Sequence, residues 1–428
     1  MRTVDLFCGA GGMSLGFQRA GYDLVQAYDA WEPAVATYRR NVGSHVWHHD
    51  LKDVFTVGPM IAALRPEIII GGPPCQDYSA AGKRIEGDNA GMTRAFAMYV
   101  SIARPNWFVM ENVRQAQKSR AWADATEMLK AAGYGLTESI LDASWYGVPQ
   151  RRKRLIVVGR LGERHGFLAS AVAAVRSNRQ TVVGDVLDVP QGHFYMRPFG
   201  GGRGVRSVAE PAPAIIRTSR ERPWPKYRNN PHPDDPVPLQ EAAILTQDQI
   251  ARVQGFPEGW NWGNATSRDI DQMIANALPS PLAEAIGAVI LARQAGETIP
   301  IVEGSFAQWL RRRGRSAQSA RNVKSQCNRA RRLLGGRTLT SHALEVEALE
   351  ATEDFQRLET RTQSNLRAAL RLHFEFLAEK AERRGDGRRR RSGAQLAANE
   401  LDSPWHNLGS HAPQRTQPIP HQNQGEDQ

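Results

Sequence analysis

The sequence predicts an α/β fold with an open sheet, and three observations indicate it. Short apolar runs such as Ile68–Ile70 end in Gly or Pro residues, which do not continue a strand. Segments with helical spacing of apolar residues follow several of these runs. Chemically active side chains, among them Asp29, Cys75 and Glu111, come directly after the runs. Because open α/β sheets bind ligands at the carboxyl ends of their strands, this edge is where we expect a functional site.

The composition limits the class of protein. With 428 residues the chain is long enough for two or three domains. We expect no signal peptide, because Met1–Thr3 runs directly into a strand-like segment, and no apolar stretch approaches the roughly 20 residues of a membrane span, so a soluble intracellular protein is expected. Three cysteines, Cys8, Cys75 and Cys327, form no disulfide framework and no metal-ligand spacing, so no metal is expected. A formal charge of +11 and a pI of about 9.8 favour nucleic acid as partner over an acidic membrane surface.

The N-terminal segments predict a strand, a glycine-rich turn and a helix. Val4–Phe7 has the character of a short strand, and Cys8–Phe17 turns tightly into a helix that reaches about Ala20. Such a turn brings the backbone and a helix N-terminus close to a ligand. Glycines alone are weak evidence, because any tight turn between a strand and a helix uses them.

Two aspartates strengthen this interpretation. Asp29 ends a second predicted strand, Asp23–Tyr28, about 20 residues after the turn, where an acidic side chain commonly holds a ribose diol. Asp50 follows another candidate strand end. Each aspartate alone is more simply a helix cap or a loop charge. Together with the turn, they predict an adenosine-containing cofactor across the edge of the sheet.

The stretch from Gly71 to Ser79 presents Cys75 after the run Ile68–Ile70. For an isolated Pro-Pro-Cys, a structural cysteine in a turn is the simpler interpretation. A helical pattern over Ala90–Ala103 then leads to a predicted strand, Asn106–Met110, that ends in Glu111. A carboxyl group and a thiol at neighbouring strand ends form an acid and nucleophile pair, although the sequence does not show that they meet.

A basic run precedes the last strand of this half. Trp122–Ala132 has helical spacing, and Leu155–Gly159 reads as a strand that follows the run Gln150–Arg154. Alternation at the start of a strand places Arg152 and Arg154 on one face. A solvated basic surface is the simpler explanation for such a run taken alone.

In this order, the motifs resemble the cytosine-5 DNA methyltransferase family over roughly residues 3–160 and 243–291. Asp5–Gly12 resembles its S-adenosylmethionine loop, Gly72–Gln76 its nucleophile motif and Glu111–Val113 its general-acid motif. Further matches are the Gln-x-Arg-x-Arg motif at 150–154, the segment that closes the recognition region at 245–257 and the segment Ala275–Pro279. Each motif is common, whereas the ordered set is specific.

The resemblance implies a Rossmann-like S-adenosylmethionine-dependent methyltransferase fold with a small inserted target-recognition domain and an α-helical C-terminal extension. It implies S-adenosyl-L-methionine as cofactor and Cys75, Glu111, Arg152 and Arg154 as catalytic residues. The cofactor residues that it implies are Phe7, Gly9, Ala10, Gly11, Gly12, Asp29, Asp50, Leu51, Pro73, Asn276 and Ala277. The implied reaction is methyl transfer to C5 of a flipped cytosine in a specific double-stranded DNA sequence, through a covalent adduct of Cys75 with C6.

Three positions depart from the family pattern. Ala30 stands where many members have an aromatic or large apolar residue, with Trp31 one place later. Asp248 and Gln249 replace a usual Arg-Glu pair, so an ion pair is lost or moved. Ala275 replaces a glycine, which affects close packing beside the cofactor. None of the three concerns the nucleophile or the acid, and we therefore expect activity.

The middle of the chain is expected to recognise DNA. It is basic, rich in Gly and Pro, and taken alone has the composition of a flexible linker. Its position predicts a target-recognition domain that contacts phosphates and guanine edges. The predicted DNA-binding residues are Gln76, Ser79, Arg203, Arg206, Arg217, Arg220 and Arg222. The predicted domains are catalytic (1–160 and 268–298), target-recognition (161–267), helical accessory (299–385) and a disordered basic tail (386–428).

The last third lies outside the resemblance. Residues 301–428 carry 22 Lys and Arg against 15 Asp and Glu. Apolar residues at helical spacing between 306 and 380 predict three to four amphipathic helices that serve DNA grip or self-association. In the tail, Arg388–Arg391 is expected to make salt-dependent phosphate contacts.

Three functions remain open at this point. The first is a bacterial or phage DNA methyltransferase, in restriction-modification or as an orphan enzyme, acting in the cytoplasm at the nucleoid. We expect it to bind double-stranded DNA as a monomer and to bind no membrane, and a cognate restriction endonuclease is a further candidate partner. The second is an RNA cytosine-5 methyltransferase of the same fold. The third is a DNA-binding regulator with a decayed catalytic site, against which the joint presence of Cys75, Glu111, Arg152 and Arg154 argues.

Overall fold

The structure is a computed structural model that describes residues 1–74, 88–198, 201–296, 302, 304–336, 339 and 341–401. The side chains of residues 88–90, 304 and 381–401 are outside this description. The chain divides into two compact units, Met1–Arg371 and Leu372–Gln428. The elements and contacts described below belong to the first unit, except that the last helix continues into the second.

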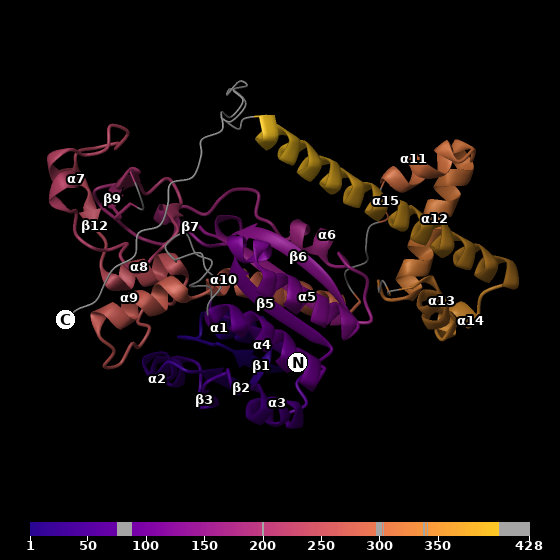
Figure 1. Ribbon diagram of the computed structural model, residues 1–428, viewed down its shortest axis with the longest axis horizontal. Coiled ribbons are helices and arrows are strands. Elements are labelled where there is room, and N and C mark those ends of the chain that lie inside the picture. The colour runs from indigo at the N-terminus through magenta and orange to yellow at the C-terminus, as the bar shows by residue number, and fades with distance from the viewer. Residues whose placement is uncertain are drawn as a thin grey trace, which may run out of the picture. The chain divides into compact units, whose positions relative to one another are not determined.

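A seven-stranded sheet forms the centre of the described part of the first unit, with strand order β3-β2-β1-β4-β5-β8-β6 (Figure 1). The first five strands of this order, β3, β2, β1, β4 and β5, pair in parallel with their neighbours, whereas β8 is antiparallel to both β5 and β6. Because the chain continues from β1 to one side and returns as β4 on the other, the carboxyl ends of β1 and β4 form the position where such sheets bind ligands. The strands are β1 (Arg2–Leu6), β2 (Asp23–Asp29), β3 (Val46–His48), β4 (Ile68–Gly71), β5 (Trp107–Val113), β6 (Tyr134–Asp142) and β8 (Lys153–Leu161).

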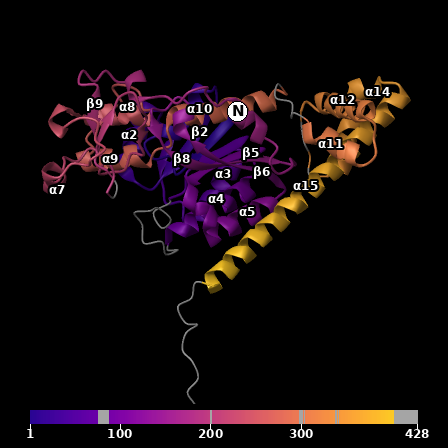
Figure 2. The same cartoon turned by 90° about the horizontal axis from the view of Figure 1, so that it is seen from above.

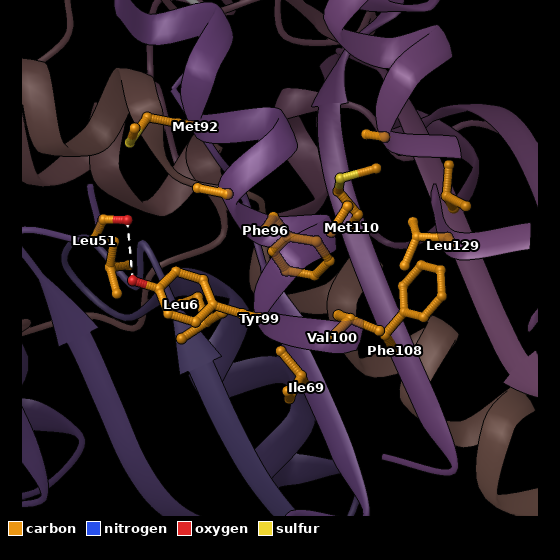
Figure 3. Packing of buried hydrophobic residues seen from close by; sticks show 14 of the residues in the cluster. Leu6, Leu51, Ile69, Met92, Phe96, Tyr99, Val100, Phe108, Met110 and Leu129 are labelled. Carbon is orange, nitrogen blue, oxygen red and sulfur yellow. Dashed lines mark hydrogen bonds between the residues drawn. The ribbon is translucent and has the colours of Figure 1, made fainter. Parts of the chain in front are cut away.

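Helices cover both faces of this sheet. Figure 2 shows α4 and α5 on one side of it and α10 on the other. Alternate residues of each buried strand point to opposite faces, so Ile69 and Phe108 pack in one core, whereas Ile70 and Val109 pack in the other. Figure 3 shows the first core, where Phe96 of α4 lies over the strands. The helices are α1 (Gly12–Arg19), α2 (Glu32–Asn41), α3 (Val54–Ala63), α4 (Asp88–Ala103), α5 (Arg120–Ala131) and α10 (Ser280–Gln294).

The region between β8 and α10 contains short strands and helices. β10, β9 and β12 form a small sheet, and β11 pairs in parallel with β7. A third core joins Phe194, Ile215 and Val253 to Ala10 of the glycine-rich turn, so this region packs directly against the loop after β1. β7 (Gln150–Arg151) precedes β8 in the chain. The elements between β8 and α10 are α6 (Ala169–Ala174), β9 (His193–Tyr195), β10 (Val205–Ser207), β11 (Ala212–Pro213), α7 (Pro225–Asn229), β12 (Ala243–Ile244), α8 (Gln247–Gln254) and α9 (Ser267–Asn276).

The last third is helical, as its amphipathic pattern predicts. Its described helices are α11 (Gly304–Arg312), α12 (Ala317–Leu333), α13 (His342–Glu350), α14 (Glu353–Gln356) and α15 (Thr360–Leu401). α15 continues to Leu401, beyond residue 386 at which the sequence predicts the start of a disordered tail. The domain boundaries given above stay predictions.

Two strands of the seven-stranded sheet differ from the sequence interpretation. β5 extends to Val113, because Glu111 and Asn112 pair with Ile156 and Leu155 of β8. Glu111 therefore lies within a strand rather than after it. β6 was not predicted, and its half-exposed alternation at Glu138 and Ile140 is typical of a sheet edge.

One helical stretch of the described residues has the length and hydropathy of a membrane span. It runs from Ser267 to Gln294, and 56% of its apolar window is buried inside the protein. Leu282, Ile286 and Ile290 of this stretch belong to the core under the sheet. A single helix of this kind is weak evidence for a membrane span, because the core helix of a globular domain passes the same test.

The core predicts a stability difference between two phenylalanines. Phe108 is fully buried, with ring centroids 5.2 Å from Tyr134 and 6.1 Å from Phe96, whereas Phe55 is 88% exposed. Phe108→Ala should lower the free energy of unfolding by about 3–5 kcal/mol, because it leaves a cavity in the sheet core. Phe55→Ala should change it by less than about 0.5 kcal/mol. Urea unfolding followed by circular dichroism measures both, and equal effects would contradict the packing described here.

Candidate active site

The turn after β1 has a backbone shape that few residues adopt. Phe7, Gly9 and Gly11 have φ values of 60°, 54° and 91°. Glycine adopts these values without strain, whereas Phe7 does so against its preference. A Cβ on Gly9 would meet no atom within 4 Å, so the backbone is open on that side. α1 begins at Gly12, and the N–H groups of a first helical turn have no partners inside the helix. This combination fits a cofactor that approaches the backbone closely.

Asp29, at the end of β2, holds this turn in place. Its Oδ2 accepts a hydrogen bond from the backbone N–H of Gly9, and its Oδ1 accepts one from the backbone N–H of Trp31, both at 2.8 Å. Burial raises the pKa of the carboxyl group, and these donors lower it in part. A carboxylate accepts up to about four hydrogen bonds. Asp29 therefore has capacity for a ribose hydroxyl while it fixes the loop.

Two further predicted cofactor residues follow β3. Asp50 is exposed, and its Oδ1 accepts a hydrogen bond from the backbone N–H of Lys52 at 3.0 Å. Leu51 is buried, and its carbonyl oxygen accepts a hydrogen bond from the Tyr99 hydroxyl at 3.0 Å, which Figure 3 shows as a dashed line. This contact fixes the chain after β3 to α4 and leaves the Asp50 carboxyl group at the surface.

A buried acid lies beneath the turn. Asp5 of β1 is fully buried, and burial raises the pKa of its carboxyl group to about 8. The Ser14 hydroxyl donates to Asp5 Oδ2 at 2.5 Å, and it lies 2.9 Å from the hydroxyl oxygen of Tyr38. Tyr38 continues the chain to His45 Nε2 at 3.1 Å. A neutral Asp5 therefore connects the start of α1 to α2 through hydroxyl groups.

The segment before α10 lies against the same loop. A Cβ on Gly12 would lie 2.5 Å from the carbonyl oxygen of Leu278 and 3.1 Å from the Cβ of Ala277, and one on Gly16 would collide with the backbone of Ser280. Both positions therefore require glycine. Ala277 thus lies beside the start of α1, as a cofactor residue would. Asn276 is exposed and accepts a hydrogen bond from the side chain of Gln272.

Glu111 lies beside the chain that leaves β4. Gly71 of β4 pairs with Met110 of β5, and Glu111 Oε2 is 2.8 Å from the position of a Cβ on Gly72. The Asn112 side chain also donates to the carbonyl oxygen of Pro73 at 3.3 Å. Strand pairing therefore brings the acid against Gly72, the first residue of the nucleophile motif, which precedes Cys75 by three residues in the sequence. Cys75 itself, with Gln76 and Ser79, lies outside the described residues.

The two arginines of the basic run have different partners. Arg154 Nε binds Glu111 Oε1 at 2.8 Å, and both side chains are at most 15% exposed. Arg152 is buried and donates to the carbonyl oxygens of Ile215 at 3.0 Å and Ala275 at 2.5 Å. Arg154 thus acts directly on the acid, whereas Arg152 joins three distant segments of the chain.

The surroundings of Glu111 act on its pKa in opposite directions. Burial raises the pKa of the carboxyl group, and the positive charges of Arg154 and Arg152 lower it in part. A raised pKa favours a protonated carboxyl group, which is what proton donation to a substrate ring nitrogen requires.

Comparison with known proteins decides the family. The family model described as C-5 cytosine-specific DNA methylase matches residues 1–197 and 203–292. The chain belongs to this family. The methylase therefore transfers a methyl group to cytosine C5 in DNA and uses S-adenosylmethionine, as the resemblance implied. The match favours DNA over RNA as substrate.

Curated relatives and a solved structure agree with this assignment. The methylase is 38% identical to the Type II methyltransferase M.HindV of Haemophilus influenzae over 296 aligned residues. The alignment covers 68% of this chain and 96% of the relative. It is 40% identical to the Type II methyltransferase M.HgiDI of Herpetosiphon aurantiacus over 291 aligned residues, and this alignment covers 66% of this chain and 92% of the relative. The fold is similar to that of the S. pombe Dnmt2 methyltransferase, with a TM-score of 0.53 and 19% identity over 69% of this chain and 99% of that one.

The arginines expected to bind DNA lie in different surroundings in the methylase. Arg203 donates to both carboxyl oxygens of Glu210 at 2.7 and 2.9 Å, and Arg220 binds Asp271 at 2.7 Å. Arg206 is half-buried and donates to the carbonyl oxygen of Arg203 at 2.9 Å. Arg217 is half-buried and Arg222 is exposed. Arg203 and Arg220 therefore give up a protein ion pair if they contact DNA, and Arg222 is the most accessible of the five.

The structure gives two of the departing positions a role. Gln249 accepts a hydrogen bond from the backbone N–H of Thr246 at 2.9 Å, and Thr246 Oγ1 accepts one from the backbone N–H of Gln249, which caps α8. The Ala275 carbonyl oxygen is a partner of Arg152. A capping box therefore stands where the family pattern has an ion pair.

Sequence reasoning missed the functions of two buried polar residues. Gln254 accepts a hydrogen bond from the Gln150 side chain at 2.7 Å and donates one to the Ala277 carbonyl oxygen at 2.6 Å. Asp5 was seen only as part of a motif. The sequence feature that could have indicated its role is an acidic residue between Val4 and Leu6 of an apolar strand. Such a position predicts either a functional carboxyl group or a buried neutral one.

The raised pKa of Asp5 predicts a pH dependence of stability. A pKa of about 8 in the folded methylase, against about 3.9 in an unfolded chain, means that folding takes up a proton in this window. The contribution of Asp5 to the free energy of unfolding should fall as pH rises from about 4 to 8, by up to about 1.4 kcal/mol per pH unit. Asp5→Asn removes this dependence, so its stability relative to wild type should rise with pH.

Urea unfolding at a series of pH values tests this expectation. Asp188→Asn is the matched control, because Asp188 is exposed and its replacement should show no comparable change. Parallel stability curves for wild type and Asp5→Asn would show that Asp5 is ionised in the folded protein.

Proposed function

We propose that the methylase modifies one specific double-stranded DNA sequence with Cys75 as nucleophile and Glu111 as acid. The observation that supports these roles is the buried ion pair of Glu111 with Arg154, placed against Gly72 where the chain leads into the Pro-Pro-Cys motif. An acid with a raised pKa beside a thiol is the pair that activation of the cytosine ring requires.

The chemistry starts from a poor nucleophile, cytosine C5. The Cys75 thiolate attacks C6 to form a sulfur–carbon bond, and Glu111 protonates or hydrogen-bonds N3, so that the ring electrons move to C5. Bound S-adenosylmethionine supplies an electrophilic methyl group for C5. Loss of the C5 proton to a base, for which water suffices, and cleavage of the bond to Cys75 release the product. Arg154 orients Glu111 and holds its carboxyl group, and its positive charge favours a nearby thiolate.

The cofactor would be held by the loop after β1 and its neighbours. Asp29 would bind the ribose hydroxyls, and the first turn of α1 would supply N–H donors to an anionic group. The further residues proposed to line this site are Phe7, Gly9, Ala10, Gly11, Gly12, Asp50, Leu51, Pro73, Asn276 and Ala277. Arg152 would act as a positioning residue, because its guanidinium group binds backbone carbonyls on both sides of the site.

The target base must leave the duplex to reach this pocket, which costs a few kcal/mol. Contacts from Gln76, Ser79 and the arginines of the recognition region would offset this cost. Because the compared relatives are Type II methyltransferases, we assign the enzyme to restriction-modification, with an orphan role as the alternative. It would act as a monomer on DNA in a bacterial or phage-infected cytoplasm, at the nucleoid, with a cognate endonuclease as possible partner.

Methylation of genomic DNA by the purified protein tests this function. We expect bisulfite sequencing to find 5-methylcytosine at one short motif after incubation with S-adenosylmethionine. Cys75→Ser should lose this activity and keep cofactor binding, because the loop after β1 is separate from the nucleophile motif. Turnover by Cys75→Ser at the wild-type rate would exclude the covalent mechanism, and cofactor binding without any 5-methylcytosine would favour a decayed regulator.

Glu111→Gln tests the acid. The amide has nearly the same shape but donates no proton, so kcat should fall by about 10²–10⁴-fold while DNA affinity stays close to wild type. Glu127→Gln on the exposed surface of α5 is the matched control and should leave kcat unchanged. A kcat for Glu111→Gln within a few-fold of wild type would remove Glu111 from the acid role.

A further inference from the structure

The helical extension separates its charges along the chain. Residues 304–336 contain nine Lys and Arg and no Asp or Glu. Residues 341–359, which follow, contain six Asp and Glu and a single Arg. The first segment forms α11 and α12, and the second contains α13 and α14. α11 and α12 therefore form a purely basic helical hairpin.

Seven of the nine basic side chains of this hairpin are exposed, Lys324 is half-buried and Arg331 is buried. On α12, the helical spacing of Arg321, Lys324, Arg329 and Arg332 places them on one side. The buried Ala320, Cys327 and Ala330 define the opposite side of the same helix. The exposed arginines of the hairpin are Arg311, Arg312, Arg313, Arg315, Arg321, Arg329 and Arg332.

Buried ion pairs fix this hairpin to the methyltransferase core. Arg331 of α12 binds Glu345 of α13 at 2.6 Å, and both side chains are fully buried. Arg164, which follows β8, also binds Glu345. Removing one partner of such a pair leaves a buried charge uncompensated and costs about 3–5 kcal/mol, so Glu345 and its two arginines must stay together in the folded protein.

A second set of contacts reinforces this connection. Glu163 forms a β-bridge with Leu339, and its carboxyl group lies 3.4 Å from Arg293 of α10. α10 is the helix that packs against α1 and the cofactor loop. The hairpin is therefore carried by the catalytic core, and its charges have a defined place relative to it.

We propose that the exposed basic face of α11 and α12 binds the phosphate backbone of duplex DNA outside the methylated site. The inference rests on the DNA methyltransferase function. Guanidinium groups bind phosphate oxygens, and a face without acidic residues repels no part of the DNA. The family model ends at residue 292, so this surface is additional to the part of the chain that it describes. The hairpin lengthens the footprint on DNA and adds affinity without adding sequence information.

The test uses a variant with six substitutions, Arg311→Gln, Arg312→Gln, Arg315→Gln, Arg321→Gln, Arg329→Gln and Arg332→Gln. Glutamine keeps the helices, because its helix propensity is close to that of arginine. Arg313, which stacks on Trp309, and the buried Arg331 are retained. Circular dichroism and the thermal midpoint check that the variant folds as wild type does.

Affinity is measured on two duplexes that contain the sequence found by bisulfite sequencing. The short duplex spans little more than that sequence, and the long one adds about two helical turns on either side. On the long duplex, the variant should bind about tenfold or more weakly than wild type, and the slope of log K against log salt should lose about 0.9 for each phosphate contact removed. On the short duplex, affinity and kcat should equal those of wild type.

Two controls make the outcomes distinct. A variant with Lys130→Gln, Arg357→Gln and Arg361→Gln removes exposed charges outside the hairpin and should bind both duplexes as wild type does.

Unchanged affinity of the six-substitution variant on the long duplex would overturn the proposal, as would an equal loss on both duplexes. If wild type is a dimer in solution and the six substitutions make it a monomer, the basic face binds the acidic helices α13 and α14 of a second copy, and the proposal is overturned. Methylation of the short duplex by wild type is scored separately, so failure of the enzymatic function is distinguishable from failure of this proposal.

Discussion

The close approach of α10 to α1 is the constraint on which the site depends. Gly12 and Gly16 allow the backbone of the returning chain to lie where any side chain would stand. The chain leaves the sheet after β8, forms the region of short strands and helices and returns to α1 at Ser280. This contact also sets the position of Ala277 beside the start of α1. A larger residue at either glycine would therefore displace α1 or the chain that returns to it.

Burial separates the acids at the edge of the sheet into different roles. Asp5, Asp29 and Glu111 all have raised pKa values because they are removed from water. Asp5 accepts a hydrogen bond from the Ser14 hydroxyl, and burial favours its neutral form, whereas Asp29 receives backbone N–H donors that support its charge. Glu111 alone of the three has a guanidinium partner, Arg154, within 2.8 Å. An uncompensated buried charge is costly, so the partners of each acid offset part of the rise in pKa that burial causes.

Much of the fold could be predicted from the sequence, because apolar runs that are buried on both faces leave a clear pattern. Ile68–Ile70 and the glycine-rich turn placed β4, β1 and α1 correctly, and the resemblance named the family that the comparison confirmed. The extension of β5 through Glu111 could not be predicted, since it depends on pairing with the distant strand β8. The contacts of Arg152 and Gln254 could not be predicted either, because they join side chains to backbone carbonyls that are 63, 123 and 23 positions away in the sequence. The role of Cys75 stays a prediction.

The hydrogen bonds that attach the region between β8 and α10 have a consequence for evolution. Gln150 and Arg152 hold Ile215 through its backbone N–H and carbonyl groups, and Arg152 and Gln254 hold Ala275 and Ala277 through their carbonyl groups. Every residue type except proline offers the same backbone groups, so these hydrogen bonds, unlike the apolar core of the region, place little demand on its side chains. New sequence preferences could therefore arise by mutation or recombination within the insert, while the machinery that transfers the methyl group stays in register.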